Sequence, residues 1–207
     1  MSTISIIGSG AMAAAIAGRT AKAGYTVEVV SRDPAKAQAL ADKLAAGATT
    51  GEYGAIPAGD IVILAVPSAS AVPVVAQYGE ALAGKVIIDI TNPINSDASG
   101  LSTADGTSAA QQIAEAAPAN AHVVKAFNTV FGHSLAPGRP LDVLFAGDDA
   151  RAKASVSAFI ESLGLRPLDA GGLAMARWLE GTGLLMVSLA GHGVGDFNFA
   201  LGVSNYR

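Results

Sequence analysis

Along most of the chain, short runs of apolar residues alternate with longer segments typical of helices. β-Branched and other apolar side chains dominate the short runs, which predicts buried strands. The predicted strands are residues 4–7, 26–30, 60–66, 85–90, 121–126 and 143–146. The predicted helices are residues 11–23, 35–44, 70–82, 108–116 and 150–162. This alternation predicts an α/β fold of the Rossmann type, a doubly wound, mostly parallel sheet with helices on both faces.

The first predicted strand leads into a glycine-rich turn, and the turn leads into an alanine-rich helix. Gly8, Gly10 and Ala13 match the dinucleotide fingerprint G-x-G-x-x-G/A. Gly8 permits the tight turn, Gly10 lets a pyrophosphate approach the backbone, and Ala13 lets the helix lie close to the strand. The amides at the helix N-terminus then face the phosphates. The alternative is a chance turn in a glycine-rich chain, but the flanking strand and helix favour a dinucleotide site.

The end of the second predicted strand distinguishes NAD from NADP. NAD sites place Asp or Glu there to bind the ribose 2′-hydroxyl. Here Ser31 and Arg32 follow the strand, and no carboxylate comes before Asp33. A hydroxyl beside a guanidinium suits a 2′-phosphate, and Lys36 adds a positive charge one helical turn later. We therefore predict NADP(H); the alternative is that Arg32 and Lys36 are merely solvated residues at a helix start.

Ligands of such sheets bind at the carboxyl ends of the strands, so the residues around each strand end are the candidate contacts. The predicted cofactor-binding residues are Gly8, Ser9, Gly10, Ala11, Met12, Ser31, Arg32, Lys36, Ala65, Val66, Pro67, Asn92 and Ala126. The predicted acceptor-binding residues are Ser68, Asn128, Met175 and Trp178. Met175 and Trp178 lie in a later apolar helical region that would wall the pocket. For Trp178, a place in the core is the alternative.

Two segments depart from the alternation. Residues 95–106 are polar, rich in Gly and Ser, and without periodicity, which predicts either disorder or a functional loop over the site. From residue 171 the chain becomes one apolar helical region with a glycine-punctuated tail. We predict a nucleotide-binding domain over residues 1–170 and a helical region over 171–207 that caps the site or pairs two subunits as a homodimer. A helix packed on its own sheet is the alternative.

Composition excludes several classes of protein. Hydrophobic residues make up 51% of the 207 residues and charged residues 14%, with a mean hydropathy of +0.42, which excludes a disordered chain. Thirteen basic and seventeen acidic residues give a net charge of −4 without a basic stripe, which argues against a nucleic-acid partner. The apolar segment 183–195 is too short to span a membrane, and no basic region precedes the apolar N-terminal residues. We therefore expect a cytoplasmic protein with no membrane partner.

Side chains for acid–base, nucleophilic or metal chemistry do not gather in the sequence. The chain has no Cys, and its three His residues are far apart without metal-ligand spacing. We expect no metal and no catalytic side chain. Hydride transfer needs none, because the cofactor carries the chemistry and the protein positions the reacting carbons. The pattern fits a redox enzyme, and it equally fits a non-catalytic NADP-binding module.

Several motifs together resemble the NADP-dependent oxidoreductases of the deazaflavin coenzyme F420. They are residues 8–12, 31–36, 108–114, 147–149, 164–171 and 191–196. The resemblance spans the whole chain and implies a Rossmann domain with a small C-terminal helical part. It further implies that nicotinamide and deazaflavin rings lie face to face in one cleft. The NADP contacts it implies are Ser9, Gly10, Ala11, Met12, Ser31, Arg32 and Lys36.

Residues 124–130 depart from the archaeal deazaflavin enzymes, which have a histidine where this chain has Asn128. This segment is more similar to bacterial relatives and to the cytosolic domain of metalloreductases. An amide at this position would donate a hydrogen bond to a carbonyl of a flavin-like ring, but it cannot act as a proton acid. The resemblance therefore transfers the cofactor half of the site and leaves the acceptor open.

Three functions follow as hypotheses. The first is an NADP(H) oxidoreductase that exchanges hydride with coenzyme F420 or a flavin. The second is an NADPH-dependent reductase of another small acceptor. The third is an NADP-binding sensor whose C-terminal helices signal through dimer geometry.

Overall fold

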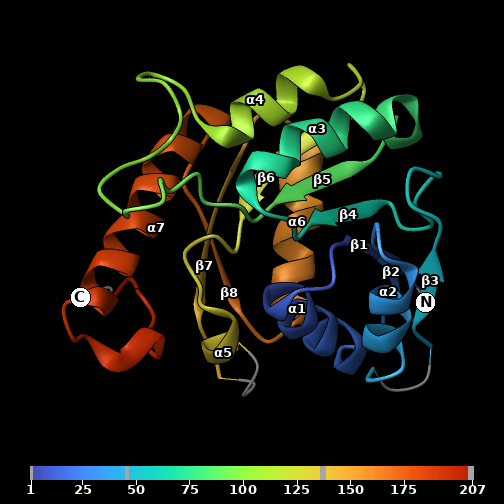
Figure 1. The fold of residues 1–207 in the computed structure, drawn as a ribbon, viewed down its shortest axis with the longest axis horizontal. Helices are drawn as coiled ribbons and strands as arrows, with labels where there is room; N and C mark the ends of the chain where they lie inside the picture. Colours follow the sequence, from blue (N-terminus) through green and yellow to red (C-terminus); the bar gives the residue numbers. More distant parts are fainter. Residues whose placement is uncertain (1, 45–46, 136–138, 205–207) are drawn as a thin grey trace.

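The computed structural model describes residues 2–44, 47–135 and 139–204, and these form one sheet of eight strands in the order β3-β2-β1-β4-β5-β6-β7-β8 (Figure 1). The strands are β1 Thr3–Ile7, β2 Thr26–Val30, β3 Thr49–Gly51, β4 Ile61–Leu64, β5 Val86–Asp89, β6 His122–Ala126, β7 Asp142–Gly147 and β8 Arg166–Asp169. Neighbouring strands are parallel except β6 and β7, which are antiparallel. The predicted fold class is confirmed.

Helices cover both faces of the sheet. The α-helices are α1 Ala11–Lys22, α2 Pro34–Ala41, α3 Ser68–Tyr78, α4 Ala109–Ala116, α5 Gly132–Leu135, α6 Ala150–Ser162 and α7 Ala176–Gly191. Short 3₁₀ helices are η1 Gly79–Leu82, η2 Leu173–Met175 and η3 Gly195–Phe197. Apolar residues of α1, α2, α5 and α6 form the core on one face, and those of α3, α4 and η2 form the core on the other. Figure 1 shows α3 and α4 on the opposite side of the sheet from α1 and α2.

The sheet order creates a switch point between β1 and β4. The chain leaves β1 toward one edge through β2 and β3, and then returns to place β4 on the other side of β1. The turn after β1 is held by a hydrogen bond from Gly8 N to Val30 O at 2.8 Å. Gly8 has φ +133°, and a Cβ there would lie 2.1 Å from Ala65 O. The strand ends approach so closely that only glycine fits between them.

The polar segment after β5 forms a hydrogen-bonded loop. Ile94 and Leu101 pair as an antiparallel bridge, and Ser102 N donates to Pro93 O at 2.6 Å. Asn95 Oδ1 accepts from Gly100 N at 3.1 Å, which closes the loop between these points. Residues 95–106 therefore form a hydrogen-bonded loop, and a functional role for it over the site stays a prediction.

A buried ion cluster fastens α7 to the sheet. Lys125 Nζ on β6 lies 2.8 Å from Asp89 Oδ2 on β5 and 3.0 Å from Glu180 Oε1 on α7, and all three side chains are fully buried. The Glu180 carboxylate also accepts from Ala109 N and Ala110 N, the first free amides of α4. The positive end of α4 therefore offsets the second carboxylate.

Within the described ranges, no helix is long and apolar enough to cross a membrane.

Candidate functional site

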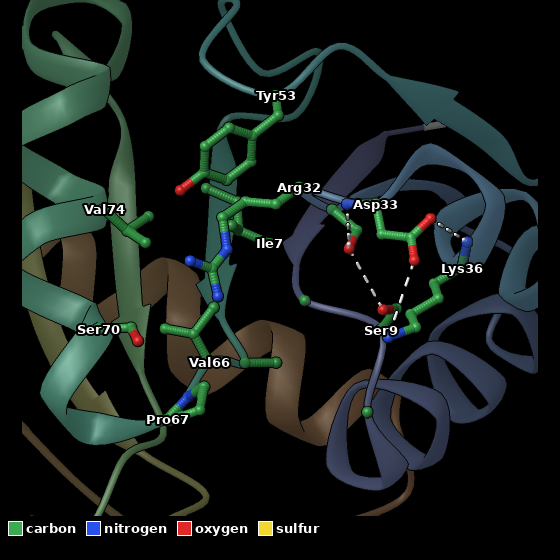
Figure 2. Close-up of a pocket in the computed structure, with 14 residues that line it drawn as sticks. Ile7, Ser9, Arg32, Asp33, Lys36, Tyr53, Val66, Pro67, Ser70 and Val74 are labelled. Carbon is green, nitrogen blue, oxygen red and sulfur yellow. Dashed lines mark hydrogen bonds and ion pairs between the residues drawn. The ribbon is translucent and has the colours of Figure 1, made fainter.

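A cavity of about 300 Å³, which we call the first cavity, lies at the switch point (Figure 2). It lies at the carboxyl ends of β1, β2 and β4 and against α3. Its lining residues are Ile7, Gly8, Ser9, Gly10, Ser31, Arg32, Asp33, Lys36, Tyr53, Ala65, Val66, Pro67, Ser70 and Val74. Most of the predicted cofactor residues therefore lie together, as expected for the ends of parallel strands.

The N-terminus of α1 opens on the first cavity and has the features of an anion site. Gly10 is the residue before the helix, with an extended backbone at φ −81° and ψ −174°. An added Cβ at Gly10 would meet nothing within 4 Å. The first turn of α1 carries no acidic side chain, so its free amides and helix dipole are open to negative charge. A pyrophosphate fits this cradle.

Hydroxyl and cationic groups gather at the end of β2. Ser9 Oγ donates to Ser31 Oγ at 3.4 Å, which links the turns after β1 and β2. Lys36 Nζ lies 3.7 Å from Asp33 Oδ2, and both side chains are largely exposed. Asp33 is itself engaged, because its Oδ1 accepts from Ala35 N and so caps α2. NAD sites use a carboxylate to bind the ribose 2′-hydroxyl, whereas the Asp33 carboxylate here caps a helix.

Arg32 takes a different position from its cationic neighbour. Figure 2 shows its guanidinium between Tyr53 and Val66, away from Lys36. The Arg32 guanidinium makes no hydrogen bond or ion pair with another of the described residues. Its fork of N–H groups is exposed and available to an anion.

Tyr53, Ser70 and Val74 line the first cavity but were not predicted from the sequence. Tyr53 stands edge-to-face on Tyr78 of α3 with ring centroids 5.5 Å apart. Burial raises the pKa of the Tyr78 hydroxyl, so this ring stays neutral behind the wall. Tyr53 follows β3, a strand that the apolar pattern does not mark, so no local signal pointed to it.

A second cavity, of about 200 Å³, lies at the carboxyl ends of β5 and β6. Its lining residues are Met12, Ile90, Asn92, Phe127, Asn128, Thr129, Val130, Phe131, Gly132, Gly183, Met186 and Val187. Gly10 lines the first cavity and Met12, in the first turn of α1, lines the second, so the α1 N-terminus stands between the two spaces. The structure therefore brings Met12, Asn92 and Asn128 together on this side.

Two predicted cofactor residues lie outside both cavities. Ala126 is fully buried in the core beside the second cavity. Ala11 is exposed at the start of α1, on a shallow hollow shared with Ser9, Gly10 and Lys36.

Asn92 and Asn128 form a reciprocal pair on the wall of the second cavity. Asn128 Nδ2 donates to Asn92 Oδ1 at 2.9 Å, and Asn92 Nδ2 donates to Asn128 O at 2.8 Å. Asn128 Nδ2 also donates to Leu179 O of α7 at 2.8 Å. Both N–H bonds of the Asn128 amide are therefore used within the protein. In this arrangement Asn128 has no N–H left for an acceptor carbonyl, and its contact with an acceptor stays a prediction.

The remaining predicted acceptor residues are dispersed. Ser68 lines a third cavity of about 160 Å³, between α3, α4 and the loop residues Ser102 and Thr103. Met175 is 37% exposed and Trp178 is 64% exposed, and neither lines the cavities described above. Trp178 is not a core residue; the Arg177 guanidinium lies over its ring at 5.9 Å. Across the described ranges, no group of three His, Asp or Glu side chains is placed to hold a metal ion.

The chain is similar to several known oxidoreductases. Residues 3–93 match the family model for NADP oxidoreductase, coenzyme F420-dependent. The F420-dependent NADP reductase of Methanothermobacter marburgensis is 31% identical over 201 residues, which cover 88% of this chain and 89% of that protein. A solved structure from Arthrobacter sp. FB24, provisionally assigned as an F420-dependent NADP reductase, superimposes with a TM-score of 0.85 at 28% identity and covers 98% of this chain and 99% of that one.

A further relative is longer. Rat metalloreductase STEAP3 is 33% identical over 181 residues, which cover 86% of this chain. The chain spans 35% of the length of that protein. The similarity to the archaeal reductase over 88% of this chain, together with the family-model match, shows that this chain belongs to the coenzyme F420-dependent NADP oxidoreductase family and is an NADP-dependent oxidoreductase.

Proposed function

We propose that this protein transfers a hydride between NADP(H) and a deazaflavin or flavin-type acceptor. The observation that carries the proposal is the pair of cavities on either side of the α1 N-terminus, because a dinucleotide bound at that helix reaches both. The name of the archaeal relative, an F420-dependent reductase, supports a deazaflavin as the acceptor.

The residues of the first cavity have distinct roles in this proposal. The open cradle at Gly10 holds the pyrophosphate on the amides of α1. Ser9, Ser31 and Lys36 surround the 2′-phosphate, and Arg32 turns toward it from its place near Val66. Ala65, Val66 and Pro67 form the apolar wall between the two cofactor ends.

The second cavity would hold the reacting rings. When bound, NADPH supplies two electrons and one proton as a hydride and becomes NADP⁺, while the oxidised acceptor takes the hydride and a proton from water. Met12, Phe127 and Met186 give this space an apolar lining, which keeps water from the transfer path. The protein acts here by positioning, with no side chain as acid or base.

Spectroscopy of the purified protein tests this proposal. Mixed with NADPH and 5-deazaflavin coenzyme or FMN, it should oxidise NADPH and reduce the acceptor in equal amounts. If the protein instead turned over a different small acceptor, that molecule would take the place of the deazaflavin as the proposed acceptor. NADPH binding without turnover of any acceptor would contradict hydride transfer and favour the sensor hypothesis.

We also propose that the C-terminal region predicted over residues 171–207, of which 205–207 lie outside the described residues, pairs two copies of the chain in the cytoplasm. Trp178 and Leu185 of α7 are 64% and 54% exposed, so this helix leaves an apolar face open. Light scattering should give a dimer at micromolar protein, and Leu185→Glu should shift it toward monomer. A wild-type monomer would contradict this.

A further inference from the structure

The hydrogen bonds of the second cavity distinguish its two amides. Asn128 cannot be turned to expose a donor, because its Nδ2 faces the carbonyl oxygen of Leu179, which only an N–H can satisfy. The same reasoning orients Asn92, since its Nδ2 faces the carbonyl oxygen of Asn128. Each assignment is consistent with the other, because Asn128 Nδ2 then donates to Asn92 Oδ1.

Asn92 retains a donor that Asn128 lacks. An Asn amide has two N–H bonds, and Asn92 uses one of them on Asn128 O. Asn92 is partly exposed and lines the second cavity, whereas Asn128 is only 6% exposed. The Thr129 hydroxyl and Asn128 Oδ1 also lack partners within the described ranges, but both atoms are shielded by protein. Asn92 therefore has one N–H without a partner among the described residues, on a partly exposed side chain that lines the second cavity.

Helix α7 fixes the position of Asn92. A Cβ on Gly183 would lie 2.5 Å from Asn92 Oδ1 and 2.7 Å from its Nδ2. The side chain thus packs directly on the α7 backbone, and a larger residue at position 183 would have to displace it. With Asn128 on its other side, Asn92 is held between two contacts and has little freedom to turn away.

We propose that Asn92 donates its free N–H to a carbonyl oxygen on a planar redox ring, and that Asn128 and Gly183 position it. This rests on the proposed function, which places the reacting rings in the second cavity. The carbonyl has two possible sources, the carboxamide of the nicotinamide and a ring carbonyl of the acceptor. The chemistry recognised is the same in both.

Two variants test the donor. Asn92→Asp keeps the shape and the oxygen that accepts from Asn128 but removes both N–H bonds, and Asn92→Ala removes the amide entirely. Asn120→Ala, in an exposed turn that lines none of the three cavities, is the matched control. Dissociation constants are measured by fluorescence for NADPH, for thio-NADPH, whose sulfur is a weak acceptor, and for 5-deazaflavin added to the enzyme with NADP⁺.

The affinities for the different ligands identify which molecule supplies the carbonyl. If the cofactor supplies it, wild type should bind NADPH about tenfold more tightly than thio-NADPH, and Asn92→Asp should remove this preference. If the acceptor supplies it, NADPH affinity should hold and deazaflavin affinity should fall about tenfold. The proposal would be overturned if Asn92→Asp and Asn92→Ala bound NADPH and the deazaflavin with the same affinities as the control, within about twofold.

Asn128→Ala tests the positioning role separately. It should show the same ligand-specific loss as Asn92→Asp, and the double variant should be no worse than Asn92→Asp alone. A purely structural residue would instead weaken both ligands alike, and that result would overturn positioning. A wild-type enzyme that binds NADPH with the thio-NADPH preference but binds no deazaflavin would refute the proposed acceptor and leave the Asn92 donor standing.

Discussion

The Lys125 ammonium on β6 lies 3.0 Å from the Glu180 carboxylate on α7, and neither side chain is exposed. Glu180 directly follows Leu179, whose carbonyl oxygen holds the Asn128 amide. The ion pair therefore fixes the stretch of α7 that faces the second cavity. Because Lys125 also binds Asp89, one cation joins two strands and a helix.

Replacing Glu180 by Ala should destabilise the fold strongly. The change leaves Lys125 with one carboxylate fewer and strips the Ala109 and Ala110 amides of their acceptor. Removing one partner of a buried pair typically costs about 3–5 kcal/mol. Urea unfolding measures this loss. Glu161→Ala on the exposed side of α6 is the control, and an equal, small loss in both variants would contradict a structural role for the pair.

Replacing Arg32 by Ala should remove most of the preference for NADPH over NADH. A charge-assisted hydrogen bond to the 2′-phosphate contributes about 1.5–3 kcal/mol, and NADH has no such phosphate. Fluorescence titration of both cofactors measures the preference. Arg151→Ala, exposed on α6, should leave it unchanged. Equal affinity of the wild type for NADPH and NADH would refute the assignment of Arg32.

Gly8 and Gly10 should respond differently to substitution. Gly10→Val should keep the melting temperature, because the Gly10 backbone suits other residues and its Cβ would meet open space. NADPH binding should collapse, because the new side chain occupies the pyrophosphate cradle. Gly8→Ala should instead lower the melting temperature, because its Cβ would clash with Ala65 O. Calorimetry and cofactor titration on both variants separate the two roles, and a Gly10→Val protein with wild-type affinity would contradict the cradle.

Acid should loosen the C-terminal segment through Asp142. Hydrogen bonds from Arg166 hold the pKa of Asp142 below its usual value, and Val203 N also donates to this carboxylate at 2.7 Å. A depressed pKa means that the stabilisation is present above the ordinary Asp pKa and is lost as the pH falls through the folded value. Asp142→Asn should lower stability at neutral pH and flatten the acid dependence of urea unfolding. The exposed Asp105→Asn is the control, and identical acid slopes in Asp142→Asn and wild type would contradict this link.

The strands that the sequence predicts are those with a strong apolar run, and the missed ones lie at sheet edges. β3 spans three largely exposed residues, and β8 contains Pro167 within a half-exposed segment. Neither has a buried face to impose a pattern, because an edge strand has fewer neighbours. A predicted strand can also extend beyond the observed one: residues 60–66 were predicted, whereas β4 spans Ile61–Leu64.

The nucleotide half of the site could be predicted because its residues sit beside the motif that places them. Ser9 and Ser31 lie in the turns after β1 and β2, Lys36 lies in the first turn of α2, and the two strands are parallel neighbours. The roles of Asn92 and Asn128 could not be predicted in the same way. They depend on Leu179 and Gly183, which approach only after α7 has packed across the sheet ends. The hydrogen-bond partners of the two amides are therefore known only once the packing of α7 is known.

The two cavities divide the chain almost in sequence order. Residues 7–74 build the first, and residues 90–187 build the second, with Met12 as the exception. The turn at Gly84, between η1 and β5, separates the two stretches. With the acceptor assigned to the second cavity, as we propose, a chimera joined at that turn should inherit its nucleotide preference from one parent and its acceptor from the other. The same proposal predicts that substitutions in the later stretch alone change the redox partner, while the nucleotide half stays unchanged.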